Sequence, residues 1–241
     1  MNYPDQKKYN IFRKNLINGW NIGLQEKFEK RLFNPNPRHS ITDLIGIGKQ
    51  ICKWHKRDYI IGPISRKVAE DNNVTLNMLF GVPKPDGSTR PILNLSDTAG
   101  TKDCINNHLN PELTTVEYVQ QKELIYTILA MGKGAYLWAK DLENGYNNVP
   151  ICESDIYNLG FTLDNKIYLY QVLPMGLSSS PKIFTDFMHF PIWAIKNNKP
   201  DIYYTWVHPD NICINDCTAD SDIVKDDINN VSNTINTILF G

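Results

Sequence analysis

Residues 173–181 read LPMGLSSSP, a Pro-Gly turn that leads into a serine-rich helix start. They begin 32 residues after Asp141, which ends the hydrophobic run 135–140. A short apolar strand would fix this carboxylate where a metal can bind, while Gly176 lets the backbone come close to a base or a sugar. Alone, an Asp is most often a helix N-cap and Pro-x-Gly is most often only a turn. Their order and spacing together indicate a site that handles nucleotides.

Longer segments around these residues carry a family resemblance. The palm of a reverse transcriptase is similar to residues 136–151 (YLWAKDLENGYNNVPI), 159–161 (LGF) and 168–184 (YLYQVLPMGLSSSPKIF). The fingers hairpin of the same enzymes resembles residues 81–96 (GVPKPDGSTRPILNLS). With the flanking residues 62–65 and 103–106, the pattern resembles DIRS-like and gypsy-like retroelement polymerases in particular.

The resemblance runs from about residue 62 to the C-terminus. It implies an α+β polymerase fold of palm and fingers, with an antiparallel palm sheet backed by helices. We expect a basic helical N-terminal region (1–61), a fingers-like subdomain (62–134) with its hairpin at 78–96, and a palm (135–241). Family members continue into a thumb and usually an RNase H domain, so we expect this chain to be truncated after the palm.

Composition is ordinary for a globular protein of one medium domain, with 241 residues and 41% hydrophobic residues. No apolar run approaches the roughly 18 residues that span a bilayer, and the N-terminus lacks the apolar core of a signal peptide. Five cysteines without C-x-x-C spacing favour reduced thiols over disulfides or zinc. We therefore expect an intracellular protein, cytoplasmic or nuclear, without a membrane segment.

The net charge of −1 hides an asymmetry along the chain. Residues 1–70 hold 14 Lys and Arg against 6 Asp and Glu, whereas residues 71–241 hold 11 against 20. A basic N-terminal part suits contact with a phosphate backbone. On charge alone, a solvated helical segment is the better explanation, and only the polymerase resemblance favours contact with a template.

The hydrophobic pattern predicts mixed helices and strands. Helices are expected over 5–17, 40–54, 122–131, from residue 181, and over 224–238. Strands are expected over 78–83, 89–95, 135–140 and 166–173, with a hairpin of 203–207 and 212–215. Ser40 and Asp43 form a capping-box pattern, and residues 31–38 read as a linker. Pro191 should kink or end its helix early, because proline lacks the N–H that continues the hydrogen-bond ladder.

The resemblance implies a metal site of two palm carboxylates. Asp141 matches the first palm aspartate, and Asp210 matches the second, in a segment HPDN (208–211) where the family carries Tyr-x-Asp-Asp. Two Mg²⁺ or Mn²⁺ ions there would stabilise the attacking and leaving oxygens, with Asn211 as a third catalytic position. Asn211 replaces an acid, and Pro209 fixes φ near −65° in a turn that is strained in the family. The alternatives are a plain β-turn at 208–211 and an Asp141 that caps the following turn.

The resemblance also implies a grip on the triphosphate. Lys84 and Arg90 flank the turn 85–88 and match the fingers cations. A hairpin presents both on one face, and the Arg fork binds phosphate with two hydrogen bonds while Lys acts as a point charge. Without the resemblance, two cations near a turn are more often a solvated edge.

Five more residues match contacts to the nucleotide. Tyr146 matches the aromatic that blocks a 2′-hydroxyl and favours deoxynucleotides, with Asn144 and Gly145 in the sugar-contacting turn. Met175 and Gly176 match the contacts to the nucleotide and the template base. The simpler interpretations are that Tyr146 is packed and that Met175 fills the core.

The sequence thus predicts template-directed DNA synthesis on RNA by two-metal nucleotidyl transfer. Its expected partners are an RNA or DNA primer-template, deoxynucleoside triphosphates, and the thumb and RNase H domains of a parent polyprotein. The changes at residues 208–211 and the missing thumb leave other classes open. One is a catalytically dead, retroelement-derived remnant that binds nucleic acid through its basic N-terminal region, and another is a truncated product without function.

Overall fold

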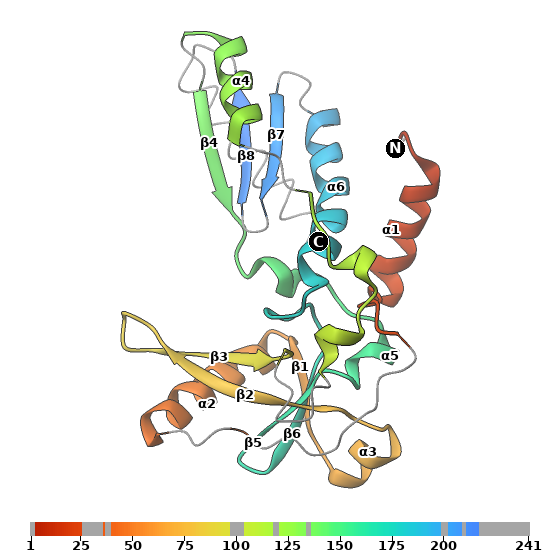
Figure 1. Cartoon of the computed structure of the whole chain (residues 1–241), viewed down its shortest axis with the longest axis vertical. Helices are drawn as coiled ribbons and strands as arrows, with labels where there is room; N and C mark the ends of the chain where they lie inside the picture. Colours follow the sequence, from red (N-terminus) through yellow and green to blue (C-terminus); the bar gives the residue numbers. More distant parts are fainter. Residues whose placement is uncertain are drawn as a thin grey trace. The chain divides into compact units, whose positions relative to one another are not determined.

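The computed structural model describes residues 3–25, 36, 40–96, 104–117, 121–133, 136–198, 202–208 and 211–216. They belong to two compact units, each assembled from segments that are distant in the sequence (Figure 1). Unit 1 comprises Met1–Phe12, Val116–Gly145 and Phe184–Gly241, and unit 2 comprises Arg13–Thr115 and Tyr146–Ile183. Helices and strands occur in both, as the α+β prediction requires.

Unit 2 is built on a mixed five-stranded sheet of order β1-β6-β5-β2-β3. The strands are β1 (Ile60–Ile64), β6 (Lys166–Tyr170), β5 (Gly160–Leu163), β2 (Leu76–Pro83) and β3 (Thr89–Asn94). β2 runs parallel to β5, and the other neighbours are antiparallel. The predicted strands at 78–83 and 89–95 are confirmed, whereas the strand predicted over 166–173 ends at Tyr170.

Helix α2 (Ile41–Lys56) packs against β1, β2 and β3. Its start is fixed by Ser40, whose side chain accepts a hydrogen bond from the Asp43 backbone N–H at 3.1 Å, which confirms the predicted cap. The helix buries one apolar stripe, consisting of Ile47, Ile51 and Trp54.

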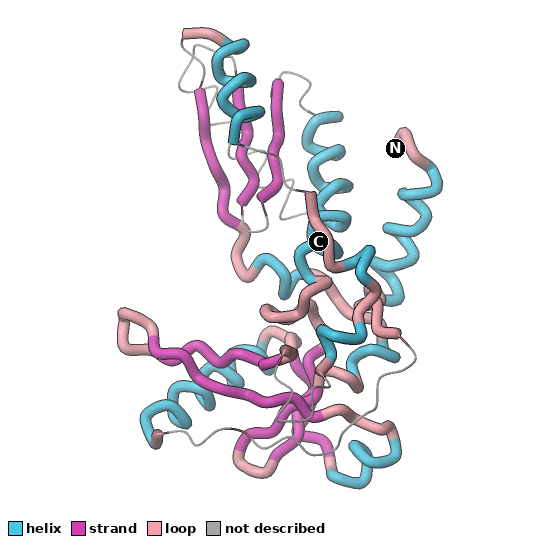
Figure 2. The backbone as a smooth tube through the Cα atoms, in the orientation of Figure 1, coloured by secondary structure: helices cyan, strands magenta, loops and turns pink. Residues whose placement is uncertain are grey.

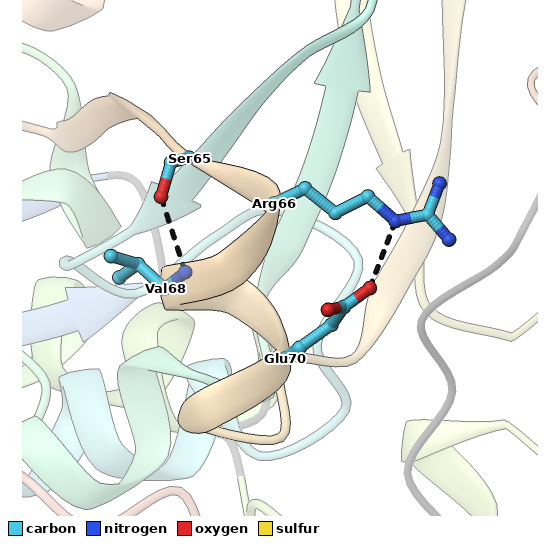
Figure 3. A network of polar contacts seen from close by, with 4 residues as sticks. All are labelled: Ser65, Arg66, Val68 and Glu70. Carbon is cyan, nitrogen blue, oxygen red and sulfur yellow. Dashed lines mark hydrogen bonds and ion pairs between the residues drawn. The ribbon is translucent and has the colours of Figure 1, made fainter.

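A short helix, α3 (Arg66–Asp71), connects β1 to β2. Figure 3 shows its two stabilising contacts: the Ser65 hydroxyl accepts from the Val68 N–H at 3.2 Å, and Arg66 pairs with Glu70 at 2.9 Å. Both charged side chains are exposed, so this i,i+4 pair adds only about 0.3–0.5 kcal/mol.

The N-terminal segment after α1 is part of unit 2. Trp20 forms a bridge with Ile151, and its N–H donates to the Pro150 carbonyl at 2.9 Å. The Ile22 N–H donates to the buried carboxylate of Asp155 at 2.8 Å. Short elements complete this unit: η1 (Ile105–His108), η2 (Pro111–Leu113) and α5 (Glu153–Ile156).

Unit 1 contains an antiparallel sheet of order β4-β8-β7. The strands are β4 (Tyr136–Asp141), β8 (Asn211–Asp216) and β7 (Ile202–His208), and α4 (Gln121–Met131) precedes β4. β7 and β8 form the predicted hairpin, and the predicted helix at 122–131 and strand at 135–140 are confirmed. Figure 2 shows the three strands as one layer.

An aromatic cluster joins α1 (Gln6–Asn18) to α6 (Ser180–Asn198) in unit 1. Phe12 stacks on Phe190 with ring centroids 4.6 Å apart, and Tyr3 meets Trp193 edge to face at 5.0 Å. Such aromatic pairs each add about 0.5–1.5 kcal/mol beyond the buried area.

Pro191 was predicted to kink or end its helix early, and the early end is wrong, because α6 continues to Asn198. Pro191 removes one backbone hydrogen bond at a cost of roughly 3 kcal/mol. Burial of the residues that follow, including Ile192 and Ala194, offsets this cost. The predicted helix at 224–238 lies outside the described residues, as does the predicted linker at 31–38 except Asn36.

Among the described residues, no helix is both long and apolar enough to cross a membrane. Among the described side chains, Cys52, Cys104 and Cys152 are free cysteines. Burial raises the pKa of the Cys152 thiol, so this group is poorly suited to act as a nucleophile.

Candidate nucleotide-binding site

Asp141 is the last residue of β4, and the strand register places it directly opposite Asn211, the first residue of β8. Directly opposed residues of an antiparallel pair have Cα atoms roughly 4.5–5.5 Å apart. Pro209 and Asp210 connect β7 to β8 and lie outside the described residues. Two of the three predicted catalytic positions, Asp141 and Asn211, therefore meet at one end of one sheet.

A turn follows Asp141 and leads into η3 (Gly145–Asn148). Asn144 has φ of 59°, a left-handed conformation that Asn tolerates better than most residues. The Gly145 N–H donates to the Leu142 carbonyl at 3.2 Å. Tyr146, the next residue, belongs to unit 2 and is half-buried.

The β2–β3 hairpin presents Lys84 and Arg90 on one face. Val82 lies opposite Arg90, and the Lys84 N–H donates to the Ser88 carbonyl at 2.7 Å, which continues the pairing into the turn. Opposed residues, and residues two apart along a strand, share a face of the hairpin. Lys84 and Arg90 are both exposed, so the shared face is turned towards solvent.

The opposite face of the hairpin packs on α2. Thr89, which alternates with Arg90, is buried, and a Cβ added to Gly46 of α2 would lie 2.6 Å from its hydroxyl. This contact explains the small residue in α2 and fixes which side the cations occupy. At the tip, hydrogen bonds from Ser88 lower the pKa of Asp86, and its negative charge stands near Lys84.

The turn at Met175 and Gly176 lies beside β3 in the same unit. Gly176 has φ of +95°, and a Cβ added there would lie 3.1 Å from the Leu93 carbonyl oxygen, so both conformation and space favour glycine. Met175 is 56% exposed, which argues against the alternative that it fills the core. The hydroxyl of Ser180 donates to the Pro174 carbonyl at 2.9 Å and closes the turn against the start of α6.

Sequence reasoning missed Asn106, a residue of η1. Its side-chain amide donates to the Gly176 carbonyl at 2.8 Å and to the Ser96 hydroxyl at 2.7 Å, and its side-chain oxygen accepts from the Ser178 N–H at 2.9 Å. The sequence held one signal: Asn106 ends the segment 103–106, which carries part of the family resemblance. The hydrogen-bond partners of Asn106 are up to 72 residues away, so the sequence alone did not reveal them.

The candidate residues thus fall into two groups. Lys84, Arg90, Tyr146, Met175 and Gly176 belong to unit 2, whereas Asp141, Asn144, Gly145 and Asn211 belong to unit 1. In unit 2, β3 carries Arg90, and Leu93, which neighbours Gly176, lies three residues further, roughly 10 Å along a strand. The described part of the chain contains no cluster of three or more His, Cys, Asp or Glu suited to a metal.

Comparison with known proteins gives a family match. The sequence model of the family described as "Reverse transcriptase (RNA-dependent DNA polymerase)" matches residues 82–215, more than half of the chain. The match extends from the β2–β3 hairpin to β8, and it includes all the candidate residues named above.

Curated relatives are polyproteins of viruses and transposons. The Pro-Pol polyprotein of feline foamy virus is 32% identical over 108 residues, which cover 44% of this chain and 8% of the polyprotein. That of simian foamy virus type 1 is 28% identical over 123 residues, 51% of this chain and 10% of the polyprotein. The transposon Tf2-7 polyprotein of Schizosaccharomyces pombe is 23% identical over 159 residues, 66% of this chain and 10% of the polyprotein. The chain spans a tenth or less of the length of these relatives.

Proposed function

We propose that this chain, which belongs to the reverse transcriptase (RNA-dependent DNA polymerase) family, is the fingers and palm of a retroelement polymerase that extends a primer along an RNA template. The α+β fold is that of a reverse transcriptase palm. The observation that carries the proposal is the register of β4 and β8, which pairs Asp141 with Asn211 beside the family's second acidic position.

The residues at this end of the sheet fit a divalent cation. Asp141 and Asp210 offer carboxylate oxygens and Asn211 an amide oxygen, the donors that Mg²⁺ and Mn²⁺ prefer. Asp141 and Asp210 would hold the metal, since Asp210 directly precedes the residue paired with Asp141. When bound, two such ions stabilise the attacking and leaving oxygens of the phosphoryl transfer.

Side chains of unit 2 hold the incoming deoxynucleoside triphosphate. Lys84 and Arg90 bind its phosphates from the exposed face of the hairpin. Met175 and Gly176 contact the nucleotide and the template base, and the close approach of Gly176 to β3 leaves the backbone of the turn without a side chain at this point. These residues bind and orient the substrate. Positioning and charge stabilisation are the main contributions of the protein to phosphoryl transfer.

The turn 144–146 contacts the sugar. Asn144, with its positive φ, and Gly145 shape the backbone after Asp141. The ring of Tyr146 would exclude a 2′-hydroxyl from the sugar site. The site would therefore select deoxynucleotides over ribonucleotides.

A second function is favoured by one observation, the Asn at position 211. Replacing the family's acid by Asn removes one negative charge at the position paired with Asp141. A copy in which this change abolishes metal binding would be a nucleic-acid-binding remnant, held on its template by the basic N-terminal residues.

Primer extension on an RNA template separates the two functions. The purified chain should extend a DNA primer in Mg²⁺ or Mn²⁺, and Asp141→Asn should abolish extension while the Kd for primer-template stays within about twofold. Template binding without extension in either metal would support the remnant. An Asp141→Asn protein as active as the wild type would contradict the polymerase assignment.

A further inference from the structure

Asn106 connects three separate segments of unit 2 through one side chain. Its amide N–H groups reach the Gly176 carbonyl and the Ser96 hydroxyl, and its amide oxygen accepts from the Ser178 N–H. An amide has two donor hydrogens and one acceptor oxygen, so both donors and the acceptor are used. Asn106 therefore holds the turn 173–181 on both sides of Leu177 and ties it to the end of β3.

The backbone at Asn106 is anchored by burial and by a hydrogen bond. The preceding residue, Ile105, is almost fully buried, and the Asn106 backbone N–H donates to the Leu95 carbonyl at 3.1 Å. Leu95 itself is buried and directly follows β3. Asn106 is thus anchored next to the end of the strand that carries Arg90, and it couples the position of that strand end to Gly176.

The turn at Gly176 is packed closely on β3, so its placement affects the geometry of the nucleotide site. The turn approaches β3 so closely that a single added methyl at Gly176 would lie 3.1 Å from the Leu93 carbonyl oxygen. A shift of the turn away from β3 would therefore change the separation between the Arg90 side and the Met175–Gly176 side of the nucleotide site. Misplacement of a binding group by about 1 Å is enough to cost a large factor in an enzyme's rate.

We propose that Asn106 is a positioning residue that sets the Met175–Gly176 turn against the β3 strand and thereby tunes the affinity for the incoming deoxynucleoside triphosphate. The inference rests on the proposed function of the same site. Asn106 acts through the Gly176 carbonyl and the Ser178 N–H, so its loss weakens nucleotide binding and leaves primer-template binding in place.

The test compares Asn106→Ala and Asn106→Asp with the wild type. The Asp variant keeps the size and the acceptor for Ser178 but loses the donors to Gly176 and Ser96. The control is Asn72→Ala, which removes an exposed Asn that donates to a backbone carbonyl of the same unit. Three quantities are measured: the Kd for deoxythymidine triphosphate on a dideoxy-terminated primer-template in Mg²⁺, the Kd for primer-template, and amide hydrogen exchange of peptides covering 173–181.

Both Asn106 variants should raise the nucleotide Kd roughly tenfold and speed exchange in 173–181, with the primer-template Kd and the Tm close to those of Asn72→Ala. Unchanged exchange in either folded variant would overturn the positioning role, as would faster exchange with an unchanged nucleotide Kd. If the wild type bound no nucleotide, the proposed function would fall together with this inference, whereas a failure confined to the variants' effect would overturn the inference alone.

Discussion

Gly176 shows how much of this site is decided by single residues. Its φ of +95° lies in a region that side chains rarely adopt, and its neighbour is a carbonyl oxygen, which cannot rotate away as a flexible side chain would. The sequence predicted that this glycine lets the backbone come close to a base or a sugar, which stays a prediction. The structure shows a different close approach, to the Leu93 carbonyl near the end of β3. Asn106 was beyond prediction, because its partners at Gly176 and Ser178 are 70 and 72 residues away.

Gly176→Ala should lower the free energy of unfolding by about 1–2 kcal/mol, because it adds both a left-handed alanine and a contact with Leu93. Gly48→Ala is the matched control: Gly48 lies inside α2 with nothing within 4 Å of an added Cβ. That variant should gain about 0.5–1 kcal/mol, since alanine is the better helix former. Urea denaturation measures both, and equal effects of the same sign would show that an alanine at position 176 is not strained.

Among the elements, those with clear patterns were predicted and those fixed by tertiary contacts were not. The β2–β3 hairpin follows from two apolar segments around a Pro-Asp-Gly turn, and burial along β3 alternates as expected for a strand with one buried face. β1 and β5 have five and four residues, too few to show a period. α6 passes through Pro191 because the burial of its later residues outweighs a local rule.

The exposed cations of the β2–β3 hairpin lead to a prediction about nucleotide affinity. If the face shared by Lys84 and Arg90 binds phosphates, Lys84→Ala and Arg90→Ala should each raise the KM for deoxynucleotides roughly tenfold, because each removes a charge-assisted hydrogen bond. Arg90→Lys should recover only part of this loss, since it keeps the charge but not the fork.

Steady-state single-nucleotide incorporation measures these constants. Arg66→Ala is the control, because Arg66 is an exposed cation of the same unit that pairs with Glu70 in α3 (Figure 3). Values of KM for the hairpin variants no higher than for Arg66→Ala would exclude the phosphate role.

For the molecule as a whole, the sequence predicted the fold class, but it did not predict how the strands pair or how the chain divides into two units. Local patterns do not reveal that β2 pairs in parallel with β5, or that residues 19–25 bridge to residues near 108 and 150. Nor do they reveal that each unit collects segments from distant parts of the chain. Such pairings depend on which apolar faces meet in space, and periodicity along the chain does not contain that information.

Burial of Tyr170 makes the stability of unit 2 sensitive to alkaline pH. Tyr170 is 4% exposed and packs edge to face on Trp54 at 5.1 Å, and burial raises the pKa of its phenol above the ordinary value of 10. Above about pH 10 the unfolded phenol loses its proton while the folded one keeps it, so stability is fully present below pH 10 and falls as pH rises further.

Tyr170→Phe should therefore lose less stability than the wild type between pH 8 and pH 10.5, although other tyrosines contribute equally to both proteins. Urea denaturation at the two pH values gives the difference. An identical loss in both proteins would show that Tyr170 ionises as freely in the folded state as in the unfolded state.

Asp141 is paired with Asn211, the residue that follows Asp210 in the sequence, and we propose that the two aspartates hold one metal ion. Mn²⁺ binding tests this shared site without any need for catalysis. Mn²⁺ affinity is measured for the wild type, Asp141→Asn, Asp210→Asn and the double variant, with the exposed Asp164→Asn as control. Two ligands of one ion are coupled, so each single change should remove most of the affinity and the double change little more. Effects that add independently, or two single variants that bind Mn²⁺ as tightly as Asp164→Asn, would contradict the shared site.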